Sequence, residues 1–87
     1  MDYLIYSKSH IITKDFSDTG DVKAMISIDA YPMNKQGEQV SDGYSIAKVI
    51  LSTHNDIIVV WTSMEGRSNP EVLKLIENAQ FEIQNYK

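Results

Sequence analysis

The sequence contains no cysteine, which removes two ways of stabilising a small domain. Neither a disulfide bond nor a thiolate metal site can supplement the core, and a chain of 87 residues buries only about three fifths of its unfolded surface. The absence of cysteine is also more typical of a cytosolic protein than of a small secreted one. We therefore expect a single domain over residues 1–87, of modest stability and located in the cytoplasm.

Long apolar runs and clusters of one charge are missing as well. No stretch approaches the roughly 18 apolar residues of a membrane span, and the N-terminal residues lack the basic and apolar pattern of a targeting segment. The formal net charge is −4, from 12 acidic and 8 basic residues. Because the basic residues are scattered along the chain, we expect no nucleic-acid partner. Because no apolar run is long enough to span a membrane, we expect no membrane partner either.

Two apolar, β-branched segments are present in the middle of the chain. They cover residues 44–52 and 57–61, and the polar residues from Thr53 to Asp56 between them predict the turn of a β-hairpin. Apolar residues occupy both parities of the first arm and every position of the second. This pattern is typical of strands buried on both faces, so we expect the hairpin to form the centre of the fold.

Two further strands are predicted before this hairpin. Apolar and polar residues alternate strictly from Val22 to Tyr31, which predicts a half-buried antiparallel strand. Alternation is imperfect from Tyr3 to Phe16, as in an edge strand or a strand broken by a bulge. The segment from Pro32 to Gly43 contains proline, two glycines and mostly polar residues, and it predicts a loop that is either mobile or able to bind a partner.

A C-terminal helix is predicted to begin near residue 70. Asn69 followed by Pro70 provides an N-cap with proline at the first helical position, and Ser68 with Glu71 has the spacing of a capping box. The apolar stripe of this helix is Val72, Leu75, Ile76, Ala79, Ile83 and Tyr86. The predicted fold is therefore α+β: an antiparallel sheet of three to four strands, in the order β-β-β-β-α, with the helix packed on one face.

One short motif has the residues of a known catalytic site. Asp18-Thr19-Gly20 resembles the D-T-G of retroviral-type aspartic proteases, a resemblance that implies a homodimer with one catalytic Asp from each subunit. The family's pattern differs in that apolar residues precede the Asp, whereas Phe16-Ser17 precede it here. A polar turn accounts for the same triplet, and we favour that interpretation.

The remaining acidic and imidazole side chains match no metal motif. Asp15, Asp18 and Asp21 lack the alternate spacing and the terminal Glu of a calcium loop. His10 and His54 occur without cysteine and without a helical HExxH motif, so they predict no zinc site. We expect no cofactor, no metal and no enzymatic activity.

Apolar side chains are more numerous than one helix on one sheet can cover. Met25 and Tyr31 share the polar side of their strand, and Phe81 lies opposite the apolar stripe of the helix. Aromatic and methionine side chains are enriched at protein interfaces. The sequence therefore predicts an interface with another protein or within a homodimer, for which the candidate residues are Met25, Tyr31, Tyr44, Trp61 and Phe81.

The leading hypothesis is a small non-enzymatic interaction protein that acts through the sheet face opposite the helix. In size, acidity and lack of a catalytic motif it is similar in kind to accessory proteins of phages and mobile elements that inhibit or modulate host enzymes. The alternative is a small-ligand-binding domain that uses the sheet face, with the loop from Pro32 to Gly43 as its lid.

Overall fold

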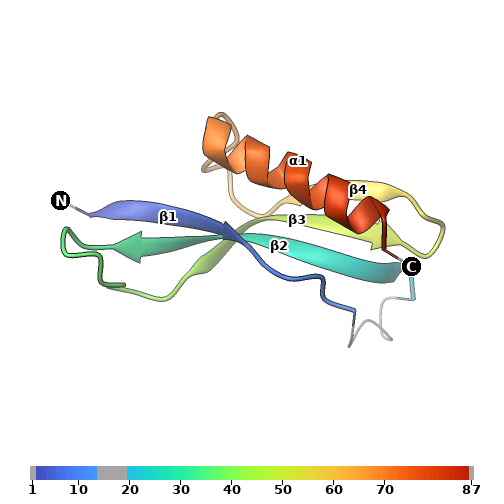
Figure 1. Ribbon diagram of the computed structural model, residues 1–87, viewed down its shortest axis with the longest axis horizontal. Helices are drawn as coiled ribbons and strands as arrows, with labels where there is room; N and C mark the ends of the chain where they lie inside the picture. The colour runs from blue at the N-terminus through green and yellow to red at the C-terminus, as the bar shows by residue number, and fades with distance from the viewer. Residues whose placement is uncertain (1, 14–19, 87) are drawn as a thin grey trace.

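The chain forms four antiparallel strands followed by one helix, as Figure 1 shows. The computed structural model describes residues 2–13 and 20–86. The elements are β1 (Tyr3–Lys8), β2 (Val22–Met33), β3 (Tyr44–Ser52), β4 (Ile57–Trp61) and α1 (Pro70–Gln84). Each strand pairs with its neighbours in sequence, so the sheet order is β1-β2-β3-β4, and α1 packs on one face. The predicted α+β fold is confirmed.

Strand β2 provides the middle of the hydrophobic core. Its strict alternation directs every second side chain toward α1, and these four side chains are fully buried. They are Ala24, Ile26, Ile28 and Ala30. The predicted stripe of α1 packs against them, with Val72, Ile76, Ala79 and Ile83 buried and with Leu75 and Tyr86 at the margin. The core therefore lies between α1 and the inner strands of the sheet.

Strand β3 contains a bulge that the sequence pattern does not reveal. Ile28 of β2 pairs with Ala47, but the next residue, Asp29, pairs with Ser45, so Ile46 is an extra residue in β3. Both Ile46 and Ala47 are fully buried members of the core. The prediction that β3 is apolar on two opposite faces is therefore wrong for Ile46, because the bulge turns its side chain into the core.

The hairpin of β3 and β4 has the predicted boundaries, but it does not lie at the centre of the sheet. β2 and β3 are the inner strands, and β4 lies at an edge. The side chains of β4 alternate between half-buried and exposed, and the exposed ones are Ile58 and Val60. The prediction that β4 is buried on both faces is wrong, because α1 packs on one face only.

Ser52 holds the turn between these two strands. Its Oγ accepts hydrogen bonds from the backbone N–H groups of His54 (3.1 Å) and Asp56 (3.0 Å). Asn55 has φ 69°, a left-handed conformation that asparagine adopts more readily than most residues. The polar residues between the two apolar arms therefore form the predicted turn.

Strand β1 lies at the other edge of the sheet. It pairs with β2 in one register up to Lys8, whereas Ile12 bridges Met25 one residue out of that register. Tyr6 packs against the core before this shift, and Ile11 packs against it after the shift. The predicted edge position and broken alternation are confirmed, although the strand ends at residue 8. The later part of the predicted strand, residues 14–16, lies outside the described residues.

Strand β2 extends further than the sequence predicts. It continues through Pro32 to Met33, and Met33 forms a further bridge with Gln39. Proline is tolerated at this position because it lies beyond the start of β3 at Tyr44, and although its missing N–H cannot donate, its carbonyl still accepts a hydrogen bond from the N–H of Val40 at 3.0 Å. The boundary predicted for the loop at Pro32 is therefore wrong by two residues.

The helix begins where the sequence predicts. Asn69 is the N-cap, its side chain accepts a hydrogen bond from the N–H of Glu71 at 2.9 Å, and Pro70 is the first helical residue. Gly66, with φ 85°, turns the connector toward the helix, and a Cβ there would lie only 3.2 Å from a methyl group of Val72. Within the described residues, no helix has the length and apolarity that crossing a membrane requires.

Two isoleucines allow the contributions of the two sheet faces to the free energy of unfolding to be compared. Ile26 is fully buried under α1, whereas Ile58 is 47% exposed. We expect Ile26→Ala to lower the free energy of unfolding by about 2–5 kcal/mol, because it removes buried methyl groups and leaves a cavity. We expect Ile58→Ala to lower it by less than about 1 kcal/mol. Urea denaturation followed by circular dichroism measures both, and equal losses would contradict the layer assignment.

Candidate functional site

The candidate site is the face of the sheet that points away from α1, which we call the open face. Residues directly opposite one another in antiparallel strands share a face, so the register identifies its members. The apolar members are Tyr3, Ile5, Ile12, Met25, Tyr31, Met33, Ile50, Ile58 and Val60. The polar members between them are Ser7, Ser27, Asp29, Ser45 and Lys48.

Four of these apolar residues form a line across the sheet, which we call the apolar row. Ile12 pairs with Met25, Met25 pairs with Ile50, and Ile50 pairs with Ile58. Val60 lies two residues from Ile58 along β4, on the same face. The row therefore runs from the segment after β1 to the outer edge of β4.

A second apolar group lies toward the other end of the sheet. Tyr3 pairs with Met33, and Ile5 pairs with Tyr31. The ring of Tyr31 lies against Gly43, where an added Cβ would overlap the ring atoms. Tyr31 therefore contributes to local packing as well as to the open face.

A polar band separates the two apolar groups. Ser7 pairs with Asp29, and Ser27 pairs with Lys48. Ser27 Oγ donates a hydrogen bond to Asp29 Oδ1 at 2.8 Å, which holds this carboxylate on the open face. The band places one negative and one positive side chain between two apolar regions.

The segment predicted to act as a loop or lid is a closed turn beside the second apolar group. Asn34 Oδ1 accepts hydrogen bonds from the N–H groups of Gln36 (3.0 Å) and Glu38 (2.9 Å). The N–H of Val40 donates to the carbonyl of Pro32 at 3.0 Å. No pocket is found among residues 2–13 and 20–86.

The five candidate interface residues do not form one surface. Met25 and Tyr31 lie on the open face, on opposite sides of the polar band. Tyr44 and Trp61 lie on the side of α1, because they pair with the buried residues Ala30 and Ala47.

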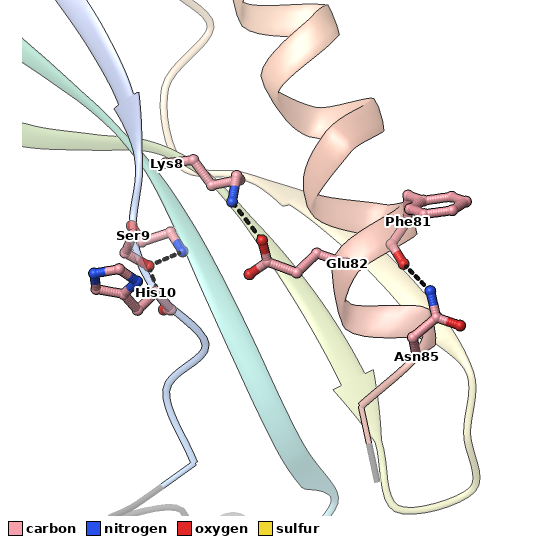
Figure 2. A network of polar contacts seen from close by, with 7 residues as sticks. Lys8, Ser9, His10, Phe81, Glu82 and Asn85 are labelled. Atoms are coloured by element: carbon pink, nitrogen blue, oxygen red, sulfur yellow. Dashed lines mark hydrogen bonds and ion pairs between the residues drawn. The ribbon is translucent and has the colours of Figure 1, made fainter.

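Trp61 and Phe81 have different surroundings on that side of the molecule. Trp61 packs against the core, and the guanidinium of Arg67 lies 5.6 Å from the centroid of its ring. Phe81 is 71% exposed, and Figure 2 shows its ring on the side of α1 that points away from Lys8. The open face therefore excludes three of the five candidates.

Seven apolar residues complete the open face beyond Met25 and Tyr31, and two of them, Ile58 and Val60, belong to β4. The sequence does not single them out, because β4 is apolar at every position and period alone cannot separate its two faces. Pairing decides the matter: Val59 is opposite the buried Val49, so its neighbours in β4 face the other way. A strand register is therefore the signal that identifies them.

A polar contact joins β1 to the helix on the covered side of the sheet. Lys8 Nζ lies 2.7 Å from Glu82 Oε1, as Figure 2 shows, and both side chains are partly exposed. The N–H of Ser27 donates to Ser9 Oγ, which donates to the carbonyl of His10, each at 2.9 Å. An exposed ion pair of this kind stabilises the fold by no more than about 1 kcal/mol.

The groups considered for catalysis and metal binding are not gathered into a site. His10 and His54 are exposed and lie in different segments, the first after β1 and the second in the β3–β4 turn. Asp15 lies outside the described residues, and so do Asp18 and Thr19 of the Asp18-Thr19-Gly20 motif. Among the residues that the structure describes, no cluster of three His, Asp or Glu side chains could hold a metal ion.

Tyr44 has the most altered acidity of the described side chains. Its hydroxyl donates to the carboxylate of Glu65, with distances of 2.7 Å to Oε1 and 2.8 Å to Oε2. This hydrogen bond, with smaller effects of burial and of the negative charge, raises the pKa of Tyr44 to about 12. The contact links the start of β3 to the connector before α1.

The pKa of Tyr44 predicts a pH dependence. In the folded protein it lies above the ordinary value near 10, so the protonated form stabilises the fold, and this stabilisation is lost as the pH rises from about 10 to about 12. We expect Glu65→Gln to return the pKa toward 10. Ultraviolet titration of the wild type and Glu65→Gln, each compared with its own Tyr44→Phe variant, isolates this tyrosine; an unchanged midpoint would contradict the assignment.

The open face is thus an apolar surface outside the core. It combines the apolar row, the second apolar group and the polar band on one side of the four strands. No protein-family model, no curated protein and no solved structure matches this chain.

Proposed function

We propose that this protein is a non-enzymatic interaction protein that binds another protein through its open face. The observation that carries the proposal is the apolar row, in which Ile12, Met25, Ile50 and Ile58 are direct neighbours across the sheet. Isolated exposed apolar residues are common on protein surfaces. In the apolar row Ile58 is exposed and the other three residues are half-buried. A continuous line of this kind is more typical of a surface that loses contact with water on binding.

The composition of the open face supports a protein partner. Methionine and tyrosine are enriched at protein interfaces, and the face contains Met25, Met33, Tyr3 and Tyr31. These side chains bury a large area when a partner covers them. Because they belong to paired strands, their backbone positions are set before binding, which reduces the backbone entropy lost on association.

The polar band supports a specific orientation of the partner. Asp29 and Lys48 carry opposite charges on the same face, and Asp29 is held by Ser27. A partner with charges in the wrong places would leave one of these groups desolvated and unpaired, which costs binding energy. The apolar row is then the main source of affinity, and the band determines the register of binding.

Capture experiments with matched variants test this function. We expect Met25→Glu and Ile58→Glu each to weaken binding of a captured partner by at least about tenfold, because each places a charge in the apolar row. Leu73→Glu is the matched control: Leu73 is 44% exposed, close to the value for Ile58, but it lies on α1. Binding affinity can be measured by biolayer interferometry with the identified partner.

Thermal unfolding of each variant separates lost binding from lost folding. The proposal is supported when both open-face variants fold and lose the partner while Leu73→Glu retains it. Equal binding by all three folded variants would exclude the open face. If a metabolite raised the Tm of the wild type but not of Ile58→Glu, and no protein were captured, the result would instead indicate a small-ligand-binding face.

A further inference from the structure

The outer edge of β4 has the features of a pairing strand. β4 is IIVVW, and no charged residue, proline or glycine occurs from Ile57 to Met64. Edge strands that avoid pairing are typically short, charged, interrupted by proline or twisted by a bulge. β4 is short, but it has none of the other three.

The opposite edge of the sheet is protected by comparison. β1 ends at Lys8, whose ammonium group pairs with Glu82 of α1, and the register shifts by one residue before Ile12. A charged residue and a bulge are two of the devices that prevent edge pairing. The two edges of one sheet therefore differ in their readiness to accept another strand.

The hydrogen bonds at the two ends of β4 determine which residues bond β3. The N–H of Thr62 donates to the carbonyl of Ile46 at 2.8 Å. At the other end, the N–H of Ser52 donates to the carbonyl of Asp56 at 2.9 Å. Bonded and non-bonded pairs alternate along an antiparallel ladder. In the register of β3 and β4, the backbone groups of the even-numbered residues of β4 therefore form the hydrogen bonds to β3.

The odd-numbered residues of β4 consequently turn their backbone groups outward. These residues are Ile57, Val59 and Trp61, and each presents one N–H and one C=O at the edge. No turn, loop or cap within residues 2–13 and 20–86 donates to or accepts from them. The pattern is symmetric about Val59, with one outward residue on each side of it.

We propose that a second copy of this chain pairs with this edge, β4 against β4, in antiparallel orientation about a twofold axis at Val59. In that register the two Val59 residues exchange two hydrogen bonds, and each Ile57 exchanges two with Trp61 of the other copy. Every outward donor then meets an acceptor. A C2 interface requires such a self-complementary surface, and a strand whose outward groups are symmetric about one residue provides it.

Charge and shape are compatible with this pairing. Asp56 of one copy lies opposite Thr62 of the other, so the two aspartates are separated by the whole length of the paired strands. α1 packs on β1, β2 and β3, of which β2 is the middle strand. Five strand spacings of about 4.8 Å separate β2 of one copy from β2 of the other, so the two helices lie about 24 Å apart. Helices in contact are about 10 Å apart, so the two helices do not collide.

The pairing joins the open faces of the two copies into one surface. Ile58 of each copy lies opposite Val60 of the other, so the apolar row of each copy continues across the axis. The result is an eight-stranded sheet with both helices on one side. The edge proposal does not depend on the proposed function, since a dimer could form whether or not the open face binds a partner.

Sedimentation equilibrium over a range of concentrations tests the pairing directly. We expect the wild-type mass to rise from 9.9 kDa toward twice that value, and Val59→Pro to remain near 9.9 kDa at the same concentrations. Proline at this position removes an outward N–H but no bond to β3. Val59→Thr is the matched control, because it keeps the N–H and the branched side chain, and it should behave as the wild type does.

Cysteine crosslinking provides a second measurement in case the proline variant does not fold. The natural chain has no cysteine, so Val59→Cys and Ile58→Cys each introduce one reporter thiol. In the Val59→Cys dimer the two thiol-bearing residues meet on the axis with Cα atoms about 5.5 Å apart, within disulfide range. In the Ile58→Cys dimer they lie about 7–8 Å apart on a diagonal. We expect Val59→Cys to crosslink several times faster under mild oxidation.

Each outcome decides the proposal. A concentration-dependent dimer that is lost in folded Val59→Pro, or preferential crosslinking at position 59, supports it. A wild type that stays at 9.9 kDa, a Val59→Pro variant that still dimerises, or crosslinking at position 58 that equals that at 59 would overturn it. If folded Val59→Pro still dimerises, the two copies associate through another surface, such as the open face.

Discussion

The packing of one helix on one face of the sheet is the constraint on which the rest of this structure depends. With its side chains, α1 is about 10 Å wide, and strands are about 4.8 Å apart, so the helix covers between two and three strands. It covers β1, β2 and β3, where Ile26 and Ile28 are fully buried. The fourth strand contacts this layer only at its margin, through one side of the strand, and the whole opposite face remains outside it. The exposed apolar surface of the protein is therefore a direct consequence of how little one helix can cover.

Two of the register shifts in the sheet, one in β3 and one after β1, increase the core that this single layer can form. In β3 the bulge adds Ile46 to the same buried layer as Ala47, although a regular strand would turn one of them away. After β1 the shift brings Ile11 to the core and Ile12 to the open face. A domain of 87 residues has little apolar surface to bury, so each side chain added to the core matters. The same shifts also determine which residues remain on the open face.

Apolar residues outside the core are arranged in relation to one another rather than scattered. The apolar row ends at Ile58, on the strand whose outer backbone groups are unpaired within the described chain. The open face and the β4 edge therefore meet at one side of the sheet. Pairing of two edges would extend the open face, and a partner bound to that face could contact both copies. The proposed binding surface and the proposed dimer are separate ideas that share this geometry.

The sequence by itself determined the order of the elements, the start of α1 near residue 70, the apolar stripe of α1 and the inward face of β2, because each depends on local chemistry or on a simple period. It also placed Met25 and Tyr31 on the face opposite the core. Only the tertiary structure decided the positions of Tyr44, Trp61 and Ile58. For Trp61 and Ile58 the reason is that a uniformly apolar strand has no internal period, so its register against β3 and the reach of the helix, which are relations between distant segments, select the buried side. For Tyr44 the reason is the bulge at Ile46, which reverses the side to which the start of β3 points.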